Sequence, residues 1–363
     1  MALIIETKTL QKLVNKVARG ASNNKLLALT SFVNICLKDG RLSLTTTDMT
    51  NYVTATEHNV TGDNFEVVIS LNNFAKLVSK TTTESITLDL TEKSLKFIGN
   101  GTYNIELPLN EENKPIKFPT YKFVNNGEAK TFEVKKSDIT NIINTNKSCL
   151  SADMTQPVLT YYYCGNNVIS ADQYNICINP INLFNDSFLI SNVMMDLISL
   201  FGEDTIQVDI QTDSVMFSSP TYCVFGKLYN DVENYPAEAI EAYIDTKFIY
   251  NCHLYKDKLI GAVDRLSIFV DKLDEGRLVL KFTDKNLTVY NATQTAFETI
   301  DYVVDEDIVE PGEFNCTING ELLKAQLNSL TSDVVNLWYG EEPGGCIKIE
   351  DHGVVKITSL MEE

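Results

Sequence analysis

The sequence predicts an α+β protein that repeats one unit three times, each unit having two helices packed on antiparallel sheets. The first observation is a strand, a tight turn and a second strand at residues 37–48, 162–172 and 281–291, spaced by about 120 residues. The second is a helix pattern with a Ser or Asn cap at residues 69–78, 189–198 and 318–327. Matching elements in matching order favour an internal repeat over the chance likeness of short amphipathic segments.

Residues 1–125 form the first predicted unit. A strand at 3–6 precedes a helix at 7–19, whose apolar residues recur at helical spacing. The Asp39–Gly40 pair supplies the hairpin turn. A second helix is expected at 71–80, with strands at 85–90, 94–98 and 102–107. Prolines and charges at 110–126 indicate a linker that ends this unit.

Residues 126–236 form the second predicted unit and residues 237–363 the third. In the second we expect strands at 131–134, 206–211, 214–218 and 222–228, with helices at 137–144 and 192–201. In the third, helices are expected at 256–267 and around Lys324. Strands are expected at 248–254, 277–283, 287–292, 296–304, 313–318, 334–339, 346–350 and 354–360. Each unit should therefore hold about eight strands, most of them half-buried.

Composition excludes several classes of protein. No run of 18 uncharged apolar residues occurs, so we expect no membrane span, and the N-terminus lacks the pattern of a signal peptide. The eight cysteines stand singly without a C-x-x-C spacing, which favours reduced thiols in a cytoplasmic protein over a zinc site. Phosphate-loop, nucleophile-elbow and H-E-x-x-H motifs are absent, so we expect neither an enzyme nor a bound cofactor or metal.

The charge pattern raises the question of nucleic-acid binding. A formal net charge of −19 disfavours generic binding to phosphates unless the basic residues gather on one surface. The first helix gathers four of them, Lys8, Lys12, Lys16 and Arg19, on one stripe without an acidic residue. A solvated helix face is the simpler interpretation. However, like charges four residues apart repel by a few tenths of a kcal/mol, a cost that a polyanion would offset.

Four segments, taken in chain order, resemble the bacterial DNA polymerase III β subunit, the β sliding clamp family. Residues 39–48 are similar to the first-domain hairpin of the family and residues 157–160 to a second-domain motif. Residues 262–267 are similar to a third-domain helix end, and residues 354–360 to the C-terminal strand. The resemblance lies in the order of the motifs and the threefold repeat, and it identifies a divergent or phage-encoded member.

The resemblance implies the DNA-clamp fold, in which two chains form a head-to-tail ring with helices around a central hole. Such a homodimer slides on double-stranded DNA as a processivity factor. Its partners are the replicative DNA polymerase, the clamp loader and other proteins with a clamp-binding motif. Contacts with DNA would be to the backbone, independent of base sequence. The pore-facing cations would be Lys8, Lys12, Lys16, Arg19, Lys25, Lys76, Lys80, Lys135, Lys136, Lys147, Lys256, Lys258 and Lys324.

The resemblance also implies two protein-binding surfaces. A hydrophobic groove for partner peptides would involve Leu159, Thr160, Asp172, Gln173, Tyr174, Asn175, Ile176, Pro236, Ile240, Val354, Val355, Ile357, Thr358 and Leu360. The family commonly has Gly or Ser, His and Arg where this chain has residues 173–175, so its peptide preference should differ. The dimer interface would join Tyr103, Ile105 and Leu107 to Leu266, Ile268 and Phe269, although each of these residues is equally compatible with an ordinary core position.

The main alternative is a protein-interaction scaffold that has the same fold and acidic surface but does not encircle DNA. The two interpretations differ in whether the basic stripe of the first helix faces a shared hole.

Overall fold

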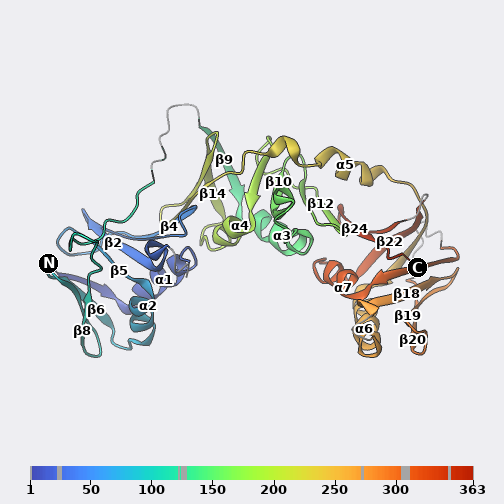
Figure 1. Cartoon of the computed structure of the whole chain (residues 1–363), viewed down its shortest axis with the longest axis horizontal. Coiled ribbons are helices and arrows are strands. Elements are labelled where there is room, and N and C mark those ends of the chain that lie inside the picture. The colour runs from blue at the N-terminus through green and yellow to red at the C-terminus, as the bar shows by residue number, and fades with distance from the viewer. Residues whose placement is uncertain are drawn as a thin grey trace. The chain divides into compact units, whose positions relative to one another are not determined.

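The computed structural model of the chain describes residues 2–22, 27–121, 123, 129–270, 274–303, 311–341 and 345–362 (Figure 1). Its described residues form three successive runs of eight strands. The first run consists of β1 (Ala2–Glu6), α1 (Thr7–Ala18), β2 (Phe32–Lys38), β3 (Arg41–Thr47), β4 (Asn51–Glu57), β5 (Phe65–Ser70), α2 (Leu71–Lys80), β6 (Ser85–Leu90), β7 (Ser94–Ile98) and β8 (Thr102–Glu106).

The second run has the same order of strands and helices. It consists of β9 (Lys130–Lys135), α3 (Lys136–Asn146), β10 (Tyr161–Cys164), β11 (Val168–Ala171), β12 (Asn175–Asn179), β13 (Phe188–Ser191), α4 (Asn192–Ile198), β14 (Thr205–Ile210), β15 (Ser214–Ser218) and β16 (Tyr222–Lys227).

The third run repeats the order once more after a short helix, α5 (Ala237–Glu241). It consists of β17 (Phe248–Tyr255), α6 (Lys256–Leu266), β18 (Arg277–Phe282), β19 (Asn286–Asn291), β20 (Phe297–Asp301), β21 (Phe314–Asn319), α7 (Gly320–Asn328), β22 (Val334–Glu341), β23 (Cys346–Asp351) and β24 (Val354–Ser359). In every run a helix follows the first strand and another follows the fifth, so the predicted threefold repeat is confirmed.

Sheet pairing repeats as faithfully as the order along the chain. Within each run the strands pair in two groups of four. In one group the neighbouring strands are, in order, the fifth, second, third and fourth of the run, and in the other they are the first, sixth, seventh and eighth. The fourth strand of one run then pairs antiparallel with the eighth strand of the next. This happens twice, as β4 with β16 and as β12 with β24. The result is two eight-stranded sheets and two four-stranded sheets among the described strands.

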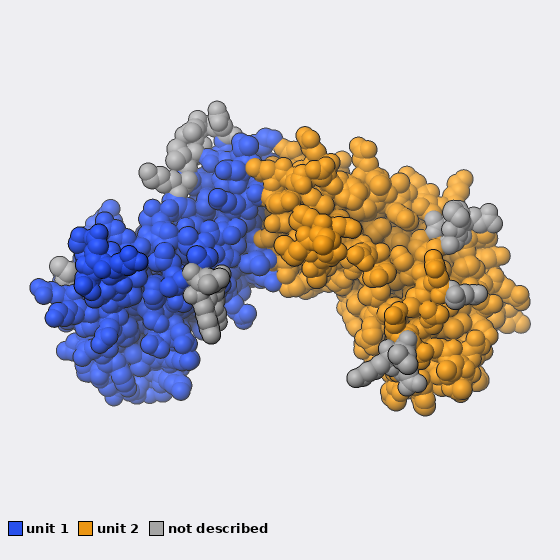
Figure 2. Space-filling model, viewed as in Figure 1, with its two compact units in different colours: residues 1–139, 193–228 blue, residues 140–192, 229–363 orange. Residues whose placement is uncertain are grey.

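The contacts divide the chain into two compact units (Figure 2). Unit 1 comprises residues 1–139 and 193–228, and unit 2 comprises residues 140–192 and 229–363. Each unit holds one eight-stranded and one four-stranded sheet. The predicted domain limits follow the sequence repeat, whereas the units follow the sheets, because each eight-stranded sheet takes four strands from each of two runs. The three-domain division therefore stays a prediction.

The local signals that predicted these elements have clear structural counterparts. Asp39 and Gly40 form the two-residue loop of the β2–β3 hairpin, both with positive φ, of 51° and 76°. Such a turn matches the right-handed twist of the strands, and glycine adopts its conformation without a steric penalty. In α1 the predicted apolar stripe is buried, at Leu10, Leu13, Val14 and Val17. The opposite side of the helix is left to solvent.

Candidate nucleic-acid interface and partner surfaces

Helices α1 and α2 of unit 1 lie side by side (Figure 1), and basic residues on and next to them form a basic surface. The helices are tied together by Gln11, whose Nε2 donates to the backbone oxygens of Val78 at 3.0 Å and Thr81 at 3.3 Å. Neither helix contains an acidic residue. We call the basic residues of this surface, including Arg19 directly after α1, the α1–α2 cations: Lys8, Lys12, Lys16, Arg19, Lys76 and Lys80.

The α1–α2 cations are largely free of ionic partners. Five of them are exposed, and Lys16 is half-buried with its Nζ 5.0 Å from the centre of the Tyr222 ring. No ion pair between described residues involves any of the six. Burial opposes ionisation of Glu203, but hydrogen bonds from Thr221 and Ser219 and the nearby Lys16 charge hold its pKa below the ordinary value. The surface therefore carries several positive charges that an external anion can approach.

The predicted cations of the later repeats lie in more varied surroundings. Lys135 and Lys147 are exposed and Lys136 is half-buried at the start of α3, whereas Lys25 lies outside the described residues. Helix α4 carries no basic residue, as its sequence indicated.

Two of the three predicted cations in the third run are engaged within the chain. Lys256 donates from Nζ to the Leu330 oxygen at 2.9 Å, and Lys324 forms an ion pair with Asp264 at 2.5 Å. Lys258 is exposed, with Nζ 5.0 Å from the Tyr255 ring centre. Among the predicted cations that the structure describes, the six α1–α2 cations therefore form the largest group without an ion pair.

A pocket of about 330 Å³ in unit 2 collects part of the predicted peptide groove. It lies beside a cluster of buried residues that includes Ile240, Val355 and Ile357, against which Leu159 and Ile176 pack. Six predicted residues line the pocket, together with four that sequence reasoning missed. They are Asp172, Gln173, Tyr174, Asn175, Ile176 and Ile357, and then Tyr243, Gly345, Cys346 and Ser359.

The turn before β12 shapes one wall of this pocket. The Asp172 carboxylate accepts hydrogen bonds from the backbone nitrogens of Tyr174 at 2.7 Å and Asn175 at 2.6 Å. This local bonding fixes the turn and leaves the Tyr174 side chain 56% exposed. Gln173 donates to Asp153 at 3.4 Å. As the sequence indicated, this chain therefore presents two amides and a neutral aromatic at residues 173–175.

Strand β24 shows which predicted groove residues belong elsewhere. Its side chains alternate between two faces. Val355 and Ile357 join the cluster beside the pocket, whereas Val354 and Leu360 pack with a different core cluster. Thr358 is also buried and does not line the pocket. Consecutive residues of β24 do not all line this pocket, because successive side chains point to opposite faces. The same alternation would have identified Ser359.

The remaining groove residues lie around the same cluster. Thr160 is half-buried at the end of a 3₁₀ turn, Pro157–Thr160. Pro236 is exposed at the start of α5, whose Ile240 is buried. None of these three lines the pocket itself.

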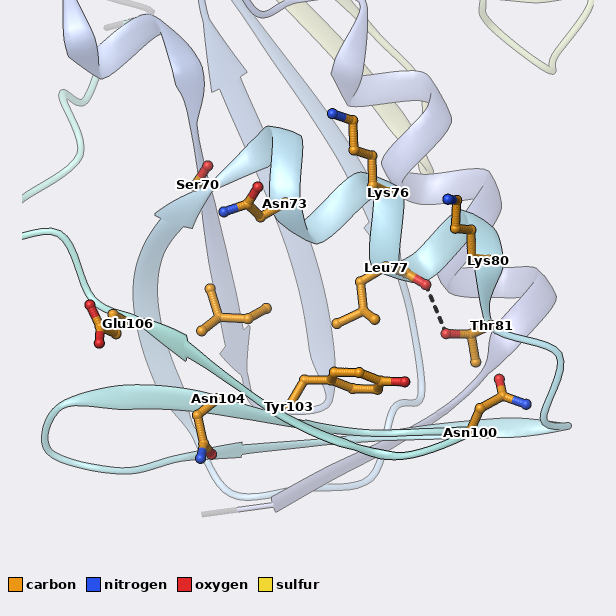
Figure 3. Close-up of a pocket in the computed structure, with 11 residues that line it drawn as sticks. Ser70, Asn73, Lys76, Leu77, Lys80, Thr81, Asn100, Tyr103, Asn104 and Glu106 are labelled. Carbon is orange, nitrogen blue, oxygen red and sulfur yellow. Dashed lines mark hydrogen bonds between the residues drawn. The ribbon is translucent and has the colours of Figure 1, made fainter.

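A second hollow, of about 670 Å³, lies between α2 and the edge strand β8 in unit 1 (Figure 3). The predicted interface residues Tyr103 and Ile105 line it, and Leu107 lines a separate pocket. Tyr103 lies beneath Leu77 with its ring against Phe97, at a centroid distance of 6.1 Å (Figure 3). It remains 42% exposed, so β8 presents both apolar side chains and a free strand edge.

The matching predicted surface in unit 2 lies after α6. Ile268 and Phe269 are 78% and 60% exposed. Leu266 is only 2% exposed, because it lies on the buried stripe of α6 with Leu259 and Val263. Its assignment to the interface is corrected to the core. Sequence reasoning missed Phe297 on the edge strand β20, which is 62% exposed.

Among the described residues, no group of three His, Cys, Asp or Glu side chains could hold a metal ion. No described helix is long and apolar enough to span a membrane.

Comparison with known proteins agrees with this geometry. Residues 1–117 match the family model described as DNA polymerase III beta subunit, N-terminal domain. The sliding clamp of Bacillus subtilis is similar, with a TM-score of 0.86 and 15% identity, over 100% of this chain and 99% of that chain. The beta subunit of Streptococcus pyogenes has a TM-score of 0.87 and 15% identity, over 100% of both chains.

The beta subunit of Borrelia burgdorferi is also similar. Its TM-score is 0.85 and its identity 17%, over 100% of this chain and 99% of that chain. No curated protein matches the chain in sequence. Identities this low show a shared fold. The chain therefore has the fold of the bacterial DNA polymerase sliding clamps along its whole length, and its first 117 residues match the family model of the DNA polymerase III beta subunit, N-terminal domain.

Proposed function

We propose that this protein is a DNA polymerase processivity factor. Two chains would form a closed ring that encircles duplex DNA, slides along it and tethers the replicative polymerase and other partners. The observation that carries the proposal is the way the sheets join. The fourth strand of one repeat pairs with the eighth strand of the next at both joins in the chain.

Applying this join once more predicts how the ring closes. The remaining fourth strand is β20 and the remaining eighth strand is β8, and each forms the edge of a four-stranded sheet. A join between β20 of one chain and β8 of the next would be head-to-tail. Such a contact generates a closed ring when the rotation between chains allows it. Unpaired strand edges are unfavourable when they are left open, so closure would also satisfy their hydrogen-bonding groups.

Phe297 supports this join because it is far more exposed than its counterparts in the other repeats, of which Tyr52 is buried and Ile176 half-buried. The equivalent positions in the three repeats are Tyr52 of β4, Ile176 of β12 and Phe297 of β20. In each repeat this residue belongs to the cross-strand residue pair that is closest to the turn between the third and fourth strands. Tyr52 pairs in register with Phe225, and Ile176 with Ile357. Tyr52 is 9% exposed, whereas Phe297 is 62% exposed. We infer that the missing cover of Phe297 comes from β8 of a second chain.

The α1–α2 cations supply the proposed contact with DNA. Lys and Arg on phosphate oxygens bind without reading bases, as a sliding ring requires. The acidic surplus elsewhere on the chain would discourage DNA from binding outside the ring. The pocket beside Tyr174 and Ile357 would accept the peptide segments of partners, and its altered wall should give it a peptide preference of its own.

Mass in solution tests the proposed closure. Light scattering on a sizing column across a dilution series should give twice the chain mass of 40.7 kDa. Phe297→Asp should shift the mass toward one chain, because it places a charge in the proposed join. Ile4→Asp, at a side chain of the same 62% exposure on the edge strand β1, is the matched control and should remain dimeric. A wild-type chain that is monomeric throughout would favour the scaffold interpretation.

A further inference from the structure

The peptide pocket of unit 2 has a filled counterpart in unit 1. Ile176 and Ile357, which line the pocket, pair across β12 and β24 as Tyr52 and Phe225 pair across β4 and β16. In unit 1 the ring of Tyr121 covers this pair, with its centroid 4.4 Å from that of Phe225 and 5.0 Å from that of Tyr52. In unit 2 the equivalent pair borders a hollow of about 330 Å³. A side chain from another molecule can therefore take the place that Tyr121 takes in unit 1.

The segment that covers the pair in unit 1 combines aromatic residues with lysines. Residues 116–123 read Ile-Lys-Phe-Pro-Thr-Tyr-Lys-Phe, without an acidic residue. Phe118 belongs to the same buried cluster as Phe225, and Tyr121 packs against that cluster. Lys117, directly before Phe118, is exposed. The segment thus shows that such a site holds apolar side chains while a neighbouring lysine stays at the surface.

The surroundings of the pocket in unit 2 are acidic. The stretch between Lys147 and Lys247 contains thirteen acidic residues and one basic residue, Lys227, which lies in unit 1. Six of the residues that line the pocket belong to this stretch. The others belong to residues 345–359, where Lys356 is fully buried and Lys348 is buried and ion-paired. Within unit 2 these two stretches therefore expose carboxylates but no lysine or arginine.

Three carboxylates lie in or beside the wall of the pocket. Asp172 lines it, and Gln173, which also lines it, donates from Nε2 to Asp153 Oδ2 at 3.4 Å. Asp245 is exposed at the end of the 3₁₀ turn that carries Tyr243, another lining residue. Among the described residues, none of these three carboxylates forms an ion pair. Their charges are therefore available to a cation from outside.

We propose that the pocket, in its proposed role as the peptide site, selects partner segments in which lysine or arginine flanks the apolar anchor. The apolar side chain packs on Ile176 and Ile357, and the flanking cations meet the carboxylates of Asp153 and Asp245. The exposed ring of Tyr174 offers the same cations a cation–π contact. A segment with aspartate or glutamate beside its anchor binds more weakly, because like charges repel.

Three labelled peptides test this preference on the full-length chain. Each has the sequence of residues 116–123 and carries two lysines, two glutamines or two glutamates at the positions of Lys117 and Lys122. Fluorescence anisotropy at low salt should give an affinity about tenfold higher for the lysine peptide than for the glutamate peptide, with the glutamine peptide between them. This ratio should shrink as salt is raised, because the charges lie at the surface.

Variants of the chain assign the preference to the pocket. Asp153→Asn with Asp245→Asn keeps the shapes of the side chains and should lower the ratio to about threefold. Asp284→Asn with Asp333→Asn removes the same charge from exposed bends before β19 and β22 and should leave the ratio unchanged. Circular dichroism shows whether each variant is folded.

The possible failures are distinguishable. If Tyr174→Ala weakens all three peptides but their affinities for the wild type are equal, or the glutamate peptide binds most tightly, the charge preference is overturned and the peptide site stands. If no peptide binds, or if Tyr174→Ala changes no affinity, the peptide-binding function of the pocket fails as well. An equal loss of the ratio in both double variants would also contradict the proposal, because net charge alone would then explain it.

Discussion

At the scale of single residues, the α1–α2 cations differ from ordinary surface lysines in having no acidic neighbour on their own helices. Each free cation that meets a phosphate releases counterions from DNA, so it adds to the salt dependence of binding. Lys8 and Lys12 are both exposed and lie one helical turn apart. They are the simplest pair with which to test whether this surface faces DNA.

Lys8→Glu with Lys12→Glu should weaken DNA binding without changing the dimer. Removing two phosphate contacts should reduce the slope of log K against log salt by roughly 1.8, at about 0.9 for each contact. Lys38→Glu with Lys96→Glu, on β2 and β7, is the control with the same change of charge. Fluorescence anisotropy with duplex DNA across a salt series measures the slope. Equal effects of the two pairs would show that only net charge matters.

Substitutions at Tyr174 and Leu360 distinguish a side chain that lines the pocket from one that packs with the core. Tyr174→Ala should lower the affinity for a peptide of the cognate polymerase by about 1–3 kcal/mol, as for aromatic side chains that anchor an interface. Leu360→Ala should spare that affinity and lower the stability of unit 2, since Leu360 packs with the core. Calorimetry gives the affinities and thermal unfolding the stabilities. The opposite pattern would place the peptide on the other face of β24.

At the scale of elements, periodicity explains both what the sequence could predict and what it could not. The buried stripe of α1 was predictable because residues three and four apart share a helix face. The Asp39–Gly40 hairpin was predictable because few residue pairs adopt its turn. In contrast, Leu266 and Leu360 were placed on surfaces, whereas Leu266 is buried and Leu360 packs, half-buried, against core residues that are distant in the chain. Tyr243 gave no local signal that it would line the pocket.

The lowered pKa of Cys149, which is fully buried near the charge of Lys356 on β24, predicts that the free energy of unfolding depends on pH. The ordinary pKa is 9.0 and the folded value about 6, so between these values the unfolded chain binds one more proton than the folded chain. The free energy of unfolding should therefore rise with pH across this window, by up to about 1.4 kcal/mol per pH unit. The contribution is complete above pH 9 and is lost as the pH falls through 6.

Urea unfolding at several pH values measures this slope. The pKa of Cys177 is raised by burial well above its ordinary value, so Cys177 stays protonated within the window. In Cys149→Ser the window should lose this part of its slope, whereas Cys164→Ser should keep it. Equal slopes in both variants and the wild type would mean that Cys149 is not ionised beside Lys356.

At the scale of the whole molecule, the repeat of sheet joins explains why one chain would be incomplete. At each internal join the aromatic or aliphatic residue after the third–fourth hairpin turn has an apolar partner and is buried or half-buried, whereas Phe297 of the last repeat is 62% exposed. A closed ring supplies that cover, and it also accounts for a strongly acidic protein that gathers free cations on two helices. The affinity for DNA can then be weak, because topology holds the ring in place.

Retention on DNA with blocked ends tests the encircling ring most directly. A duplex fixed at one end to a bead is incubated with the protein at low salt, its free end is blocked with streptavidin, and salt is raised to screen phosphate contacts. The account predicts that the protein stays bound until a restriction enzyme cuts the duplex. It also predicts that the protein leaves at once when the end is open and that Phe297→Asp is never retained. Release at the same rate from blocked and open duplexes would contradict a ring around DNA.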